Sequence, residues 1–348
     1  MITVVIPAFN EEHAIEGTIL SLRNVLESSG ISAAEILVID DGSMDATGIK
    51  SRSAGARVLR HPQNVGYGRS LKSGICAARF DTILIIDADL TYPAESIPAL
   101  LNEYHKGFDM VVGARTGHHY SGSMYKGPLR LVLQALVEFT AGRKVPDANS
   151  GMRIFSKSTI IGYLDHLCDT FSFTTSLTLA YMLTGRFVSY LSIPYHARVG
   201  KTKVKLLKDS LRTLQYIAQS AIYYNPMKIF ILFSLLCIVL SIGGFAFTAI
   251  TNISAPYFLG IGGLLLSLLM FGLGLMADLM RQILVSSRRS APPGSVGTYS
   301  NQYDDSRLEI LDAGQITFAP ESKEHNKAPS DNAEFAARNY AASDLLNR

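Results

Sequence analysis

Asp81-Thr82-Ile83-Leu84-Ile85-Ile86-Asp87-Ala88-Asp89 is the stretch from which the fold of this chain can be worked out. Four large apolar residues at its centre are flanked by polar ones, which predicts a short strand buried on both faces of a parallel sheet. The strand leads into two carboxylates, Asp87 and Asp89, at the sheet edge where open α/β sheets bind ligands. The pair suits a hard cation such as Mg²⁺, although a solvated turn without metal has the same residues.

Short apolar strands alternate with helices on both sides of this stretch. We expect further strands at residues 2–6, 35–40, 57–59 and 109–113, and helices at about 15–26, 67–79 and 94–105. This alternation predicts an α/β fold with a mostly parallel, doubly wound sheet. Asp40 and Asp41 follow the strand at 35–40, so we expect them at the same sheet edge as Asp87 and Asp89.

Several classes of protein are disfavoured by what the sequence lacks. The turn Gly66-Tyr67-Gly68 does not extend to Gly-x-Gly-x-x-Gly, and the Gly-Lys-Thr at residues 200–202 lacks the earlier glycine of Gly-x-x-x-x-Gly-Lys-Ser/Thr, which argues against dehydrogenases and P-loop enzymes. A net charge of +3 on 348 residues is too small to indicate nucleic acid as a partner. The three cysteines, Cys76, Cys168 and Cys237, have no metal-ligand spacing and are typical of reduced thiols in the cytosol.

The motifs in order resemble those of a known enzyme family. Pro7-Ala8-Phe9-Asn10-Glu11, Asp40-Asp41-Gly42-Ser43, Asn64-Val65-Gly66 and Asp87-Ala88-Asp89 are similar to the signatures of family 2 glycosyltransferases with the GT-A fold, a Rossmann-like α/β fold. Three later motifs resemble the polyprenyl-phosphate glycosyltransferases, such as dolichol-phosphate mannose synthase: residues 112–115, 147–153 and 198–203. The resemblance covers roughly residues 1–280, and Thr91 stands where some relatives have a metal-binding Gln.

The resemblance implies transfer of a sugar from a nucleotide sugar to a polyprenyl phosphate, dolichyl or undecaprenyl, with inversion at the anomeric carbon, in the synthesis of cell-envelope or glycan precursors. It implies Mg²⁺ or Mn²⁺ on Asp87 and Asp89, while UDP and GDP donors both stay open. The implied catalytic residues are Asp87, Asp89, Asp147 and Arg115. The implied nucleotide-binding residues are Pro7, Ala8, Asn10, Glu12, Asp40, Asp41 and Asp87.

The acceptor needs cations more than it needs a base. A phosphate monoester, with a second pKa of about 6, is already an anionic nucleophile at neutral pH. Bringing it close to a diphosphate requires Arg and Lys, and the candidates are Arg115, Arg130, Arg198, Lys201 and Lys203. Each single arginine could instead form a surface ion pair, although Arg198 and Lys203 are favoured because they precede the membrane helix, and Asp147 could orient the sugar or contact the acceptor side.

A membrane anchor is expected after the catalytic domain. Residues 229–250 and 257–277 are two apolar runs, each close to the ~20 residues that span a bilayer. Lys228 flanks the first run and Arg281, Arg288 and Arg289 flank the second, so we expect both termini and the catalytic domain in the cytoplasm. Residues 205–226 form a basic amphipathic helix that indicates an interfacial position, with packing on the domain as the alternative. For the helix that begins near Pro128, core packing and a membrane surface are equally compatible.

The expected organisation is therefore a GT-A catalytic domain at 1–204, an interfacial helix at 205–226, two transmembrane helices within 227–280 and a tail at 281–348. The tail is poor in large apolar residues, so we expect disorder with a short helix near 333–346. Because a strand begins at residue 2, we expect no signal peptide. A homo-oligomer is left open.

Three other functions were weighed against the transferase. A processive polysaccharide synthase of the same fold needs Gln-x-x-Arg-Trp, and this chain has no Trp. An inactive membrane scaffold is disfavoured because Asp87 and Asp89 are both present. A nucleotidyltransferase would release pyrophosphate rather than a nucleoside diphosphate, and transfer to another lipid acceptor stays an alternative.

Overall fold

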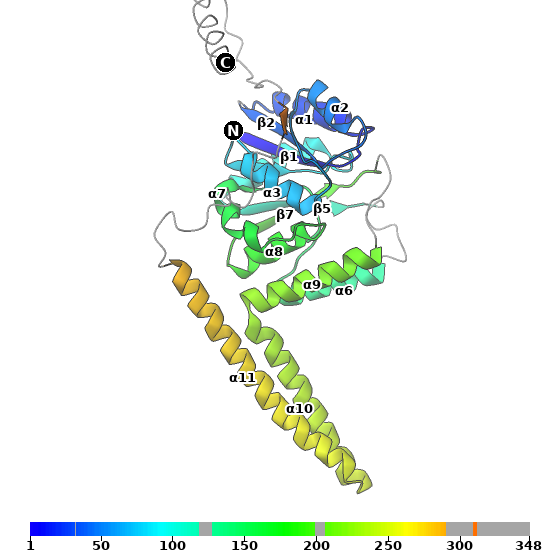
Figure 1. Ribbon diagram of the computed structural model, residues 1–348, viewed down its shortest axis with the longest axis vertical. Coiled ribbons are helices and arrows are strands. Elements are labelled where there is room, and N and C mark those ends of the chain that lie inside the picture. Colours follow the sequence, from blue (N-terminus) through cyan, green and yellow to red (C-terminus); the bar gives the residue numbers. More distant parts are fainter. Residues whose placement is uncertain (32, 118–126, 199–205, 290–308, 312–348) are drawn as a thin grey trace, which may run out of the picture. The chain divides into compact units, whose positions relative to one another are not determined.

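The computed structural model describes residues 1–31, 33–117, 127–198, 206–289 and 309–311 (Figure 1). Its strands form one sheet in the order β7-β5-β6-β4-β1-β2-β3-β8. The strands are β1 (Ile2–Ala8), β2 (Ala34–Asp40), β3 (Arg57–Arg60), β4 (Thr82–Ile85), β5 (Met110–Thr116), β6 (Arg153–Ser156), β7 (Val188–Pro194) and β8 (Glu309–Leu311). The α/β fold predicted from the alternating pattern is therefore confirmed, and β4 is the strand expected before Asp87.

Most of the sheet is parallel, as the sequence predicts. Strand β1 pairs in parallel with β2 and β4, β2 with β3, and β5 with β7. Strand β6 is the exception inside the sheet, because it lies antiparallel between β4 and β5. The chain enters β6 at Arg153 from residues 147–152, so this loop lies beside the end of β4 where the two aspartates follow.

The helices of the catalytic domain are α1 (Ile15–Ser28), α2 (Thr47–Ser53), α3 (Tyr67–Ala77), α4 (Ile97–Tyr104), α6 (Gly127–Ala141), α7 (Lys157–Ile160) and α8 (Phe173–Leu183), with 3₁₀ turns at Ala94–Ser96 and Ile161–His166. Helices α3 and α8 pack on the sheet around a core that includes Val5, Leu71, Phe155, Leu177 and Tyr181. Burial of such side chains stabilises each by about 1.5–3 kcal/mol relative to exposure, which holds the strand ends and their loops in place.

Helices α6 and α9 (Leu206–Tyr224) have a buried and an exposed apolar side. Val137 of α6 and Ile217 of α9 join Leu179 and Met182 of α8 in a second apolar cluster. Several other apolar residues of these helices are exposed: Leu131, Val132 and Phe139 in α6, and Leu211, Leu214 and Ile222 in α9. Packing on the domain is therefore observed for one side of each helix, and a membrane-facing position of the exposed side stays a prediction.

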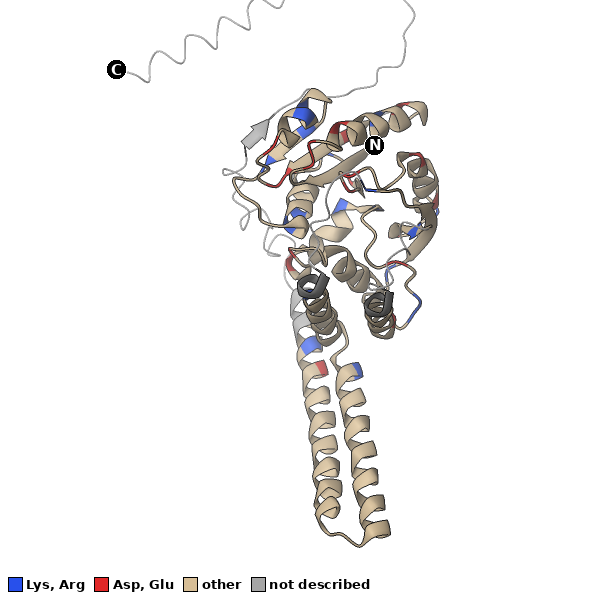
Figure 2. Ribbon diagram, turned by 90° about the vertical axis from the view of Figure 1, so that its right-hand side faces the viewer, with Lys and Arg blue, Asp and Glu red and all other residues tan. Residues whose placement is uncertain are grey.

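Helices α10 (Pro226–Thr251) and α11 (Ala255–Arg289) lie side by side as a hairpin (Figure 1). Spans of 26 and 29 residues have mean hydropathies of 2.6 and 2.2, and only 17% of each most apolar window is buried in the protein. Figure 2 shows both helices without charged residues except near one end, where Lys228, Asp278 and Arg281 occur. Length, composition and exposure make these two helices candidates to cross a membrane.

Strand β8 is not predicted by the composition of residues 281–348. Residues 309–311 pair antiparallel with β3, with Glu309 opposite Arg60 and Leu311 opposite Val58. The helix expected near 333–346 lies outside the described residues.

Candidate active site

Asp87 and Asp89 follow β4 at the edge of the sheet, as the sequence predicts. Asp89 is 4% exposed, and its Oδ1 accepts hydrogen bonds from the Thr91 hydroxyl (2.6 Å) and the Thr91 N–H (3.2 Å). Leu90 between them has φ +60°, a left-handed conformation that bulky residues seldom adopt. Thr91 thus orients Asp89 and leaves Asp89 Oδ2 for another partner.

Asp87 is oriented by Tyr67 and by the loop before β6. The Tyr67 hydroxyl donates to Asp87 Oδ1 at 2.9 Å. Gly151 lies so close that an added Cβ would be 2.6–2.7 Å from the Asp87 carboxyl atoms, so a larger residue there would displace this carboxyl. Burial, and then the charge of Asp89, raise the pKa of Asp87 to about 6. Two adjacent carboxylates are therefore held together at an energetic cost that a cation would relieve.

This donor set fits a divalent metal ion. Within the described residues, no group of three or more His, Cys, Asp or Glu side chains is placed to hold a metal, so the protein would supply two carboxylates. Mg²⁺ commonly binds through one or two carboxylates and completes its octahedron with water and phosphate oxygens. Thr91, at the position of the Gln of some relatives, donates its hydroxyl to Asp89.

The loop after β1 is held to the loop after β2 by hydrogen bonds between backbone N–H groups and side-chain oxygens. Asn10 N–H donates to Ser43 Oγ (2.9 Å), and Asn10 Oδ1 accepts from Met44 N–H (2.9 Å). Glu12 Oε2 accepts from Ala46 N–H at 3.2 Å. Pro7 and Ala8, at the end of β1, are buried. Four of the predicted nucleotide residues thus belong to one structured rim, and their contact with a nucleotide stays a prediction.

In this structure the carboxylates of Asp40 and Asp41 accept hydrogen bonds from other groups of the protein. Asp40 Oδ1 accepts from Ser43 N–H at 2.9 Å. Asp41 accepts from the N–H groups of Val65 (3.0 Å) and Gly66 (2.9 Å), and its Oδ1 lies 2.8 Å from His61 Nδ1. Burial raises the pKa of Asp41, but the His61 and backbone hydrogen bonds outweigh it and hold that pKa below its usual value. Both carboxylates therefore shape the loops of the site, and a direct bond to a base or ribose stays a prediction.

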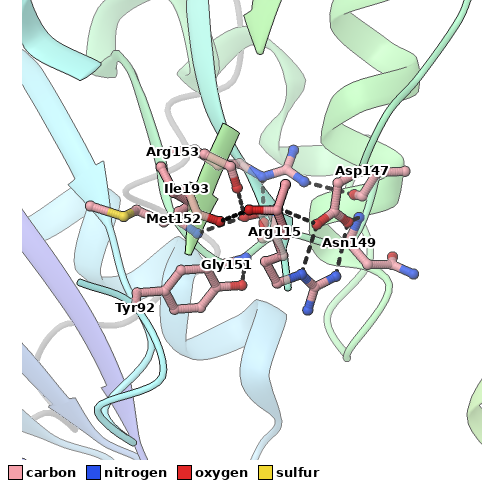
Figure 3. A network of polar contacts seen from close by, with 12 residues as sticks. Tyr92, Arg115, Asp147, Asn149, Gly151, Met152, Arg153 and Ile193 are labelled. Atoms are coloured by element: carbon pink, nitrogen blue, oxygen red, sulfur yellow. Dashed lines mark hydrogen bonds and ion pairs between the residues drawn. The ribbon is translucent and has the colours of Figure 1, made fainter. Parts of the chain in front are cut away.

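Arg115 and Asp147, both predicted as catalytic, form a bidentate ion pair (Figure 3). Arg115 Nε donates to Asp147 Oδ2 at 2.7 Å and Nη2 donates to Oδ1 at 2.9 Å. The Arg115 guanidinium also lies 5.4 Å from the ring centroid of Tyr195, which packs edge-on against Tyr92. The Nε–Nη2 edge of Arg115 thus binds a carboxylate of the protein, and its contact with a substrate phosphate stays a prediction.

Arg198 lies on the carboxylate side of the site. Its Nη2 donates to Glu11 Oε1 at 2.9 Å, and its Nε is 3.4 Å from Asp89 Oδ2. This position follows from the preceding residues, since His196 N–H donates to Thr91 O at 2.9 Å. The structure therefore brings Arg198 to the predicted metal ligands, while its expected contact with the acceptor phosphate stays a prediction.

For the other predicted cations the structure describes less than for Arg115 and Arg198. Arg130 lies in the first turn of α6. Lys201 and Lys203 lie outside the described residues.

Sequence reasoning missed four residues of the site: Glu11, Tyr67, Tyr92 and Arg153. Tyr92 accepts a hydrogen bond from Gly151 N–H at 2.6 Å, and Arg153 is wholly buried below the same loop. Glu11 and Arg153 lie within quoted motifs, Tyr67 lies in the quoted turn at residues 66–68, and Tyr92 lies three residues after Asp89, so their places near these motifs were an available signal. The contacts of Arg153 join segments up to 25 positions apart and leave no local pattern.

Comparison with known proteins extends this description. The sequence profile described as Glycosyl transferase family 2 matches residues 3–163. Undecaprenyl-phosphate 4-deoxy-4-formamido-L-arabinose transferases of Salmonella paratyphi B and Salmonella typhimurium are each 27% identical over 256 residues, which cover 72% of this chain and 75% of theirs.

Solved structures share the fold of the catalytic domain. Glucosyl-3-phosphoglycerate synthase from Mycobacterium tuberculosis in complex with Mn²⁺, UDP and phosphoglyceric acid superposes with a TM-score of 0.54 and 22% identity, covering 64% of this chain and 78% of that one. The structure of the same enzyme with Mg²⁺ and UDP superposes with a TM-score of 0.52 and 21% identity, covering 64% of this chain and 79% of that one. At this identity the likeness establishes the GT-A fold alone.

Proposed function

Because residues 3–163 of this chain form a glycosyl transferase family 2 domain, we propose that the protein transfers a sugar from a nucleoside-diphosphate sugar to a polyprenyl phosphate at the cytoplasmic face of a membrane. The observation that carries this proposal is that Arg198 Nε lies 3.4 Å from Asp89 Oδ2, while the loop at residues 147–151 joins Asp87 to the Arg115–Asp147 ion pair. Carboxylates that can hold a metal and arginines that can bind anions then lie in one site. The relatives that act on undecaprenyl phosphate support the acceptor class.

Asp87 and Asp89 would hold the metal, and Tyr67, Thr91 and Gly151 orient them for it. The bound cation supplies Lewis-acid charge neutralisation for the leaving diphosphate. Mn²⁺ and Mg²⁺ with UDP in glucosyl-3-phosphoglycerate synthase structures support this choice of group. The rim built from Asn10, Glu12 and the loop after β2 would bind the nucleoside.

The acceptor phosphate needs no strong general base, because it is a dianion over much of the neutral range. Arg115, held by Asp147 and stacked on Tyr195, can offer N–H groups to an incoming phosphate. Attack by a phosphate oxygen on the anomeric carbon, from the face opposite the diphosphate, would invert that carbon. The phosphoester stays intact and the nucleoside diphosphate leaves.

The hairpin would keep this site at the bilayer surface. A polyprenyl chain stays in the bilayer, so its phosphate is met at the headgroup level. The outward apolar sides of α6 and α9 support a position in that interface. Strand β8 follows the second span and pairs with β3 of the catalytic sheet, which supports both ends of the hairpin being on one side of the membrane. Lys228 and Arg281 support the cytoplasmic side.

A product assay tests the proposal. Purified protein in detergent is incubated with a panel of UDP- and GDP-sugars, Mg²⁺ or Mn²⁺, and undecaprenyl or dolichyl phosphate. The expected products are a polyprenyl-phosphate sugar and a nucleoside diphosphate. Release of pyrophosphate would indicate a nucleotidyltransferase, and no product with any donor would favour an inactive scaffold.

A further inference from the structure

Arg153 is the largest fully buried side chain among the described residues, with 0% of its surface exposed. Burial lowers its pKa, yet a guanidinium stays protonated in a protein. A positive charge is therefore held in the interior of the catalytic domain.

The hydrogen-bond partners of Arg153 among the described residues are neutral, and the charge of Asp147 favours the charged guanidinium. Arg153 Nε donates to Ser150 O at 2.7 Å and Nη2 donates to Ala148 O at 2.6 Å (Figure 3). Nη1 donates to Thr174 O at 2.9 Å and to Thr178 Oγ1 at 2.8 Å. Burying an ion with neutral partners is costly compared with an apolar core residue, so stability by itself is a poor reason for this residue.

Two of the four acceptors belong to the loop at residues 147–151. This loop lies between the two halves of the candidate site. At one end Asp147 holds Arg115 through two hydrogen bonds. At the other end Gly151 lies against the carboxyl of Asp87.

The other two acceptors belong to α8, which packs on the sheet. The backbone of Arg153 is itself fixed between β4 and β5, opposite Ile85 and Val112. Arg153 thus connects the loop to the two strands that carry Asp87 and Arg115 and to the helix below them.

We propose that Arg153 is a positioning residue of the transfer reaction. It folds the 147–151 loop so that Gly151 stays against Asp87 while Asp147 stays on Arg115, and it thereby sets the distance between the metal-binding carboxylates and the acceptor arginine. The proposal rests on the proposed function, because that distance matters only if donor and acceptor meet in this site.

The geometry explains why a lysine at position 153 could not hold the loop and α8 in the same way. The guanidinium spreads its donors over three nitrogens and reaches two segments at once. An ammonium has three donors on one nitrogen, so it keeps the charge but cannot bond all four acceptors in their present positions. Arg153→Lys keeps the positive charge and removes the planar set of donors, so it separates the effects of these two properties.

The test compares full-length Arg153→Lys with wild type and with Arg57→Met. Arg57 is the matched control: it is also a largely buried arginine, 17% exposed, that bonds Glu35 on β2 (2.9 Å) and Ala77 O at the end of α3 (3.1 Å). We expect both variants to lower the unfolding temperature. Only Arg153→Lys should lower kcat, on the order of 10²-fold, the size of effect that a misplacement of about 1 Å produces.

A double variant shows whether Arg153 acts through the loop. In an Asp147→Asn background the loop no longer holds Arg115 firmly, so Arg153→Lys should lower kcat only a few-fold further. Equal effects in the two backgrounds, a normal kcat in Arg153→Lys, or an equal loss of kcat in Arg57→Met would overturn the proposal.

A binding measurement keeps this result separate from the proposed function. Calorimetry with nucleoside diphosphate and Mn²⁺ should show a few-fold weaker affinity in Arg153→Lys, because Gly151 shifts off Asp87, and an unchanged affinity in Arg57→Met. If wild type makes no lipid-linked sugar, the proposed function fails, and the calorimetric difference still decides whether Arg153 positions the site.

Discussion

Arg198 Nε lies 3.4 Å from Asp89 Oδ2, and the other end of the same guanidinium donates to Glu11 Oε1 at 2.9 Å. One cation thus bridges the metal-binding loop and the loop after β1. A divalent ion on Asp89 would meet the guanidinium at this carboxylate, so the two cations compete for one oxygen. If Asp89 holds a metal ion, Arg198 should therefore affect metal binding as well as phosphate binding.

The first prediction follows from this competition. Arg198→Ala should strengthen Mn²⁺ binding to the nucleotide-free protein by about two- to fivefold, the range expected for a partly exposed ion pair. The Mn²⁺ affinity is measured from the electron paramagnetic resonance signal of free Mn²⁺. Arg186→Ala, which removes an Arg–Asp pair with Asp109, is the control and should leave Mn²⁺ binding unchanged. Weaker Mn²⁺ binding in Arg198→Ala would show that Arg198 supports the metal rather than competing with it.

The second prediction concerns Asp89 as a ligand. Asp89→Asn keeps the shape of the side chain and removes its charge, so turnover should fall at least ~10²-fold, equivalent to ~2.7 kcal/mol of barrier. Asp109→Asn is the control, since Asp109 pairs with Arg186 away from the site. Steady-state rates, measured with and without chelator, report the loss of turnover in each variant and the dependence of turnover on metal. Full activity in the presence of chelator would rule out the metal-dependent mechanism.

The third prediction is a pH dependence. Burial and the charge of Asp89 raise the pKa of Asp87 to about 6, so a proton occupies this ligand below that pH. Mn²⁺ affinity of the nucleotide-free protein should therefore be high above pH 6 and decline as the pH falls through it. Tyr67→Phe removes a hydrogen bond to the charged form, so the midpoint should move to higher pH. Calorimetric titrations at several pH values test this, and a midpoint that stays in place would exclude Tyr67 as the group that sets it.

The strands were predictable where the signal is local. Residues 83–86 and 35–40 are apolar runs that end in aspartates, and they form β4 and β2. Strand β6 is short and begins with Arg153, so its sequence looks exposed although its first side chain is wholly buried. Its place between β4 and β5 is decided by tertiary packing, because no feature of four residues specifies an antiparallel partner.

The candidate site also has features that local sequence shows and features that only the fold produces. The carboxylate motif Asp87-Ala88-Asp89 was visible because its members are adjacent in sequence. The ion pair of Arg198 with Asp89 joins residues more than a hundred positions apart, and only the fold brings them together. Asp41 has the sequence appearance of a ligand-binding residue, yet its oxygens accept bonds from Val65, Gly66 and His61. A motif thus locates a site, while the partner of each group depends on packing.

The fourth prediction is the topology of the hairpin. With two spans and the catalytic domain in the cytoplasm, the turn at Ser254 faces the opposite side of the membrane. In a background without native cysteines, Ser254→Cys should react with an impermeant maleimide from outside intact cells. Met44→Cys, at a residue that is 91% exposed on the catalytic domain, should react only after permeabilisation. Labelling of Ser254→Cys from the cytoplasmic side alone would contradict a transmembrane hairpin.

The last prediction concerns the packing of the hairpin itself, and two adjacent glycines allow a matched test. A Cβ at Gly244 would lie 2.8 Å from Pro256 O and 2.9 Å from Gly260 N, whereas a Cβ at Gly243 would meet nothing within 4 Å. Both glycines are in α10, so alanine gives each position the same gain in helix propensity, and only Gly244→Ala forces the two backbones apart. Overpacking costs about 1–3 kcal/mol, which should lower the unfolding temperature in detergent by roughly 3–10 °C. Gly243→Ala should unfold at or slightly above the wild-type temperature. Far-UV circular dichroism follows the transition, and equal unfolding temperatures for the two variants would mean that α10 and α11 do not pack through Gly244.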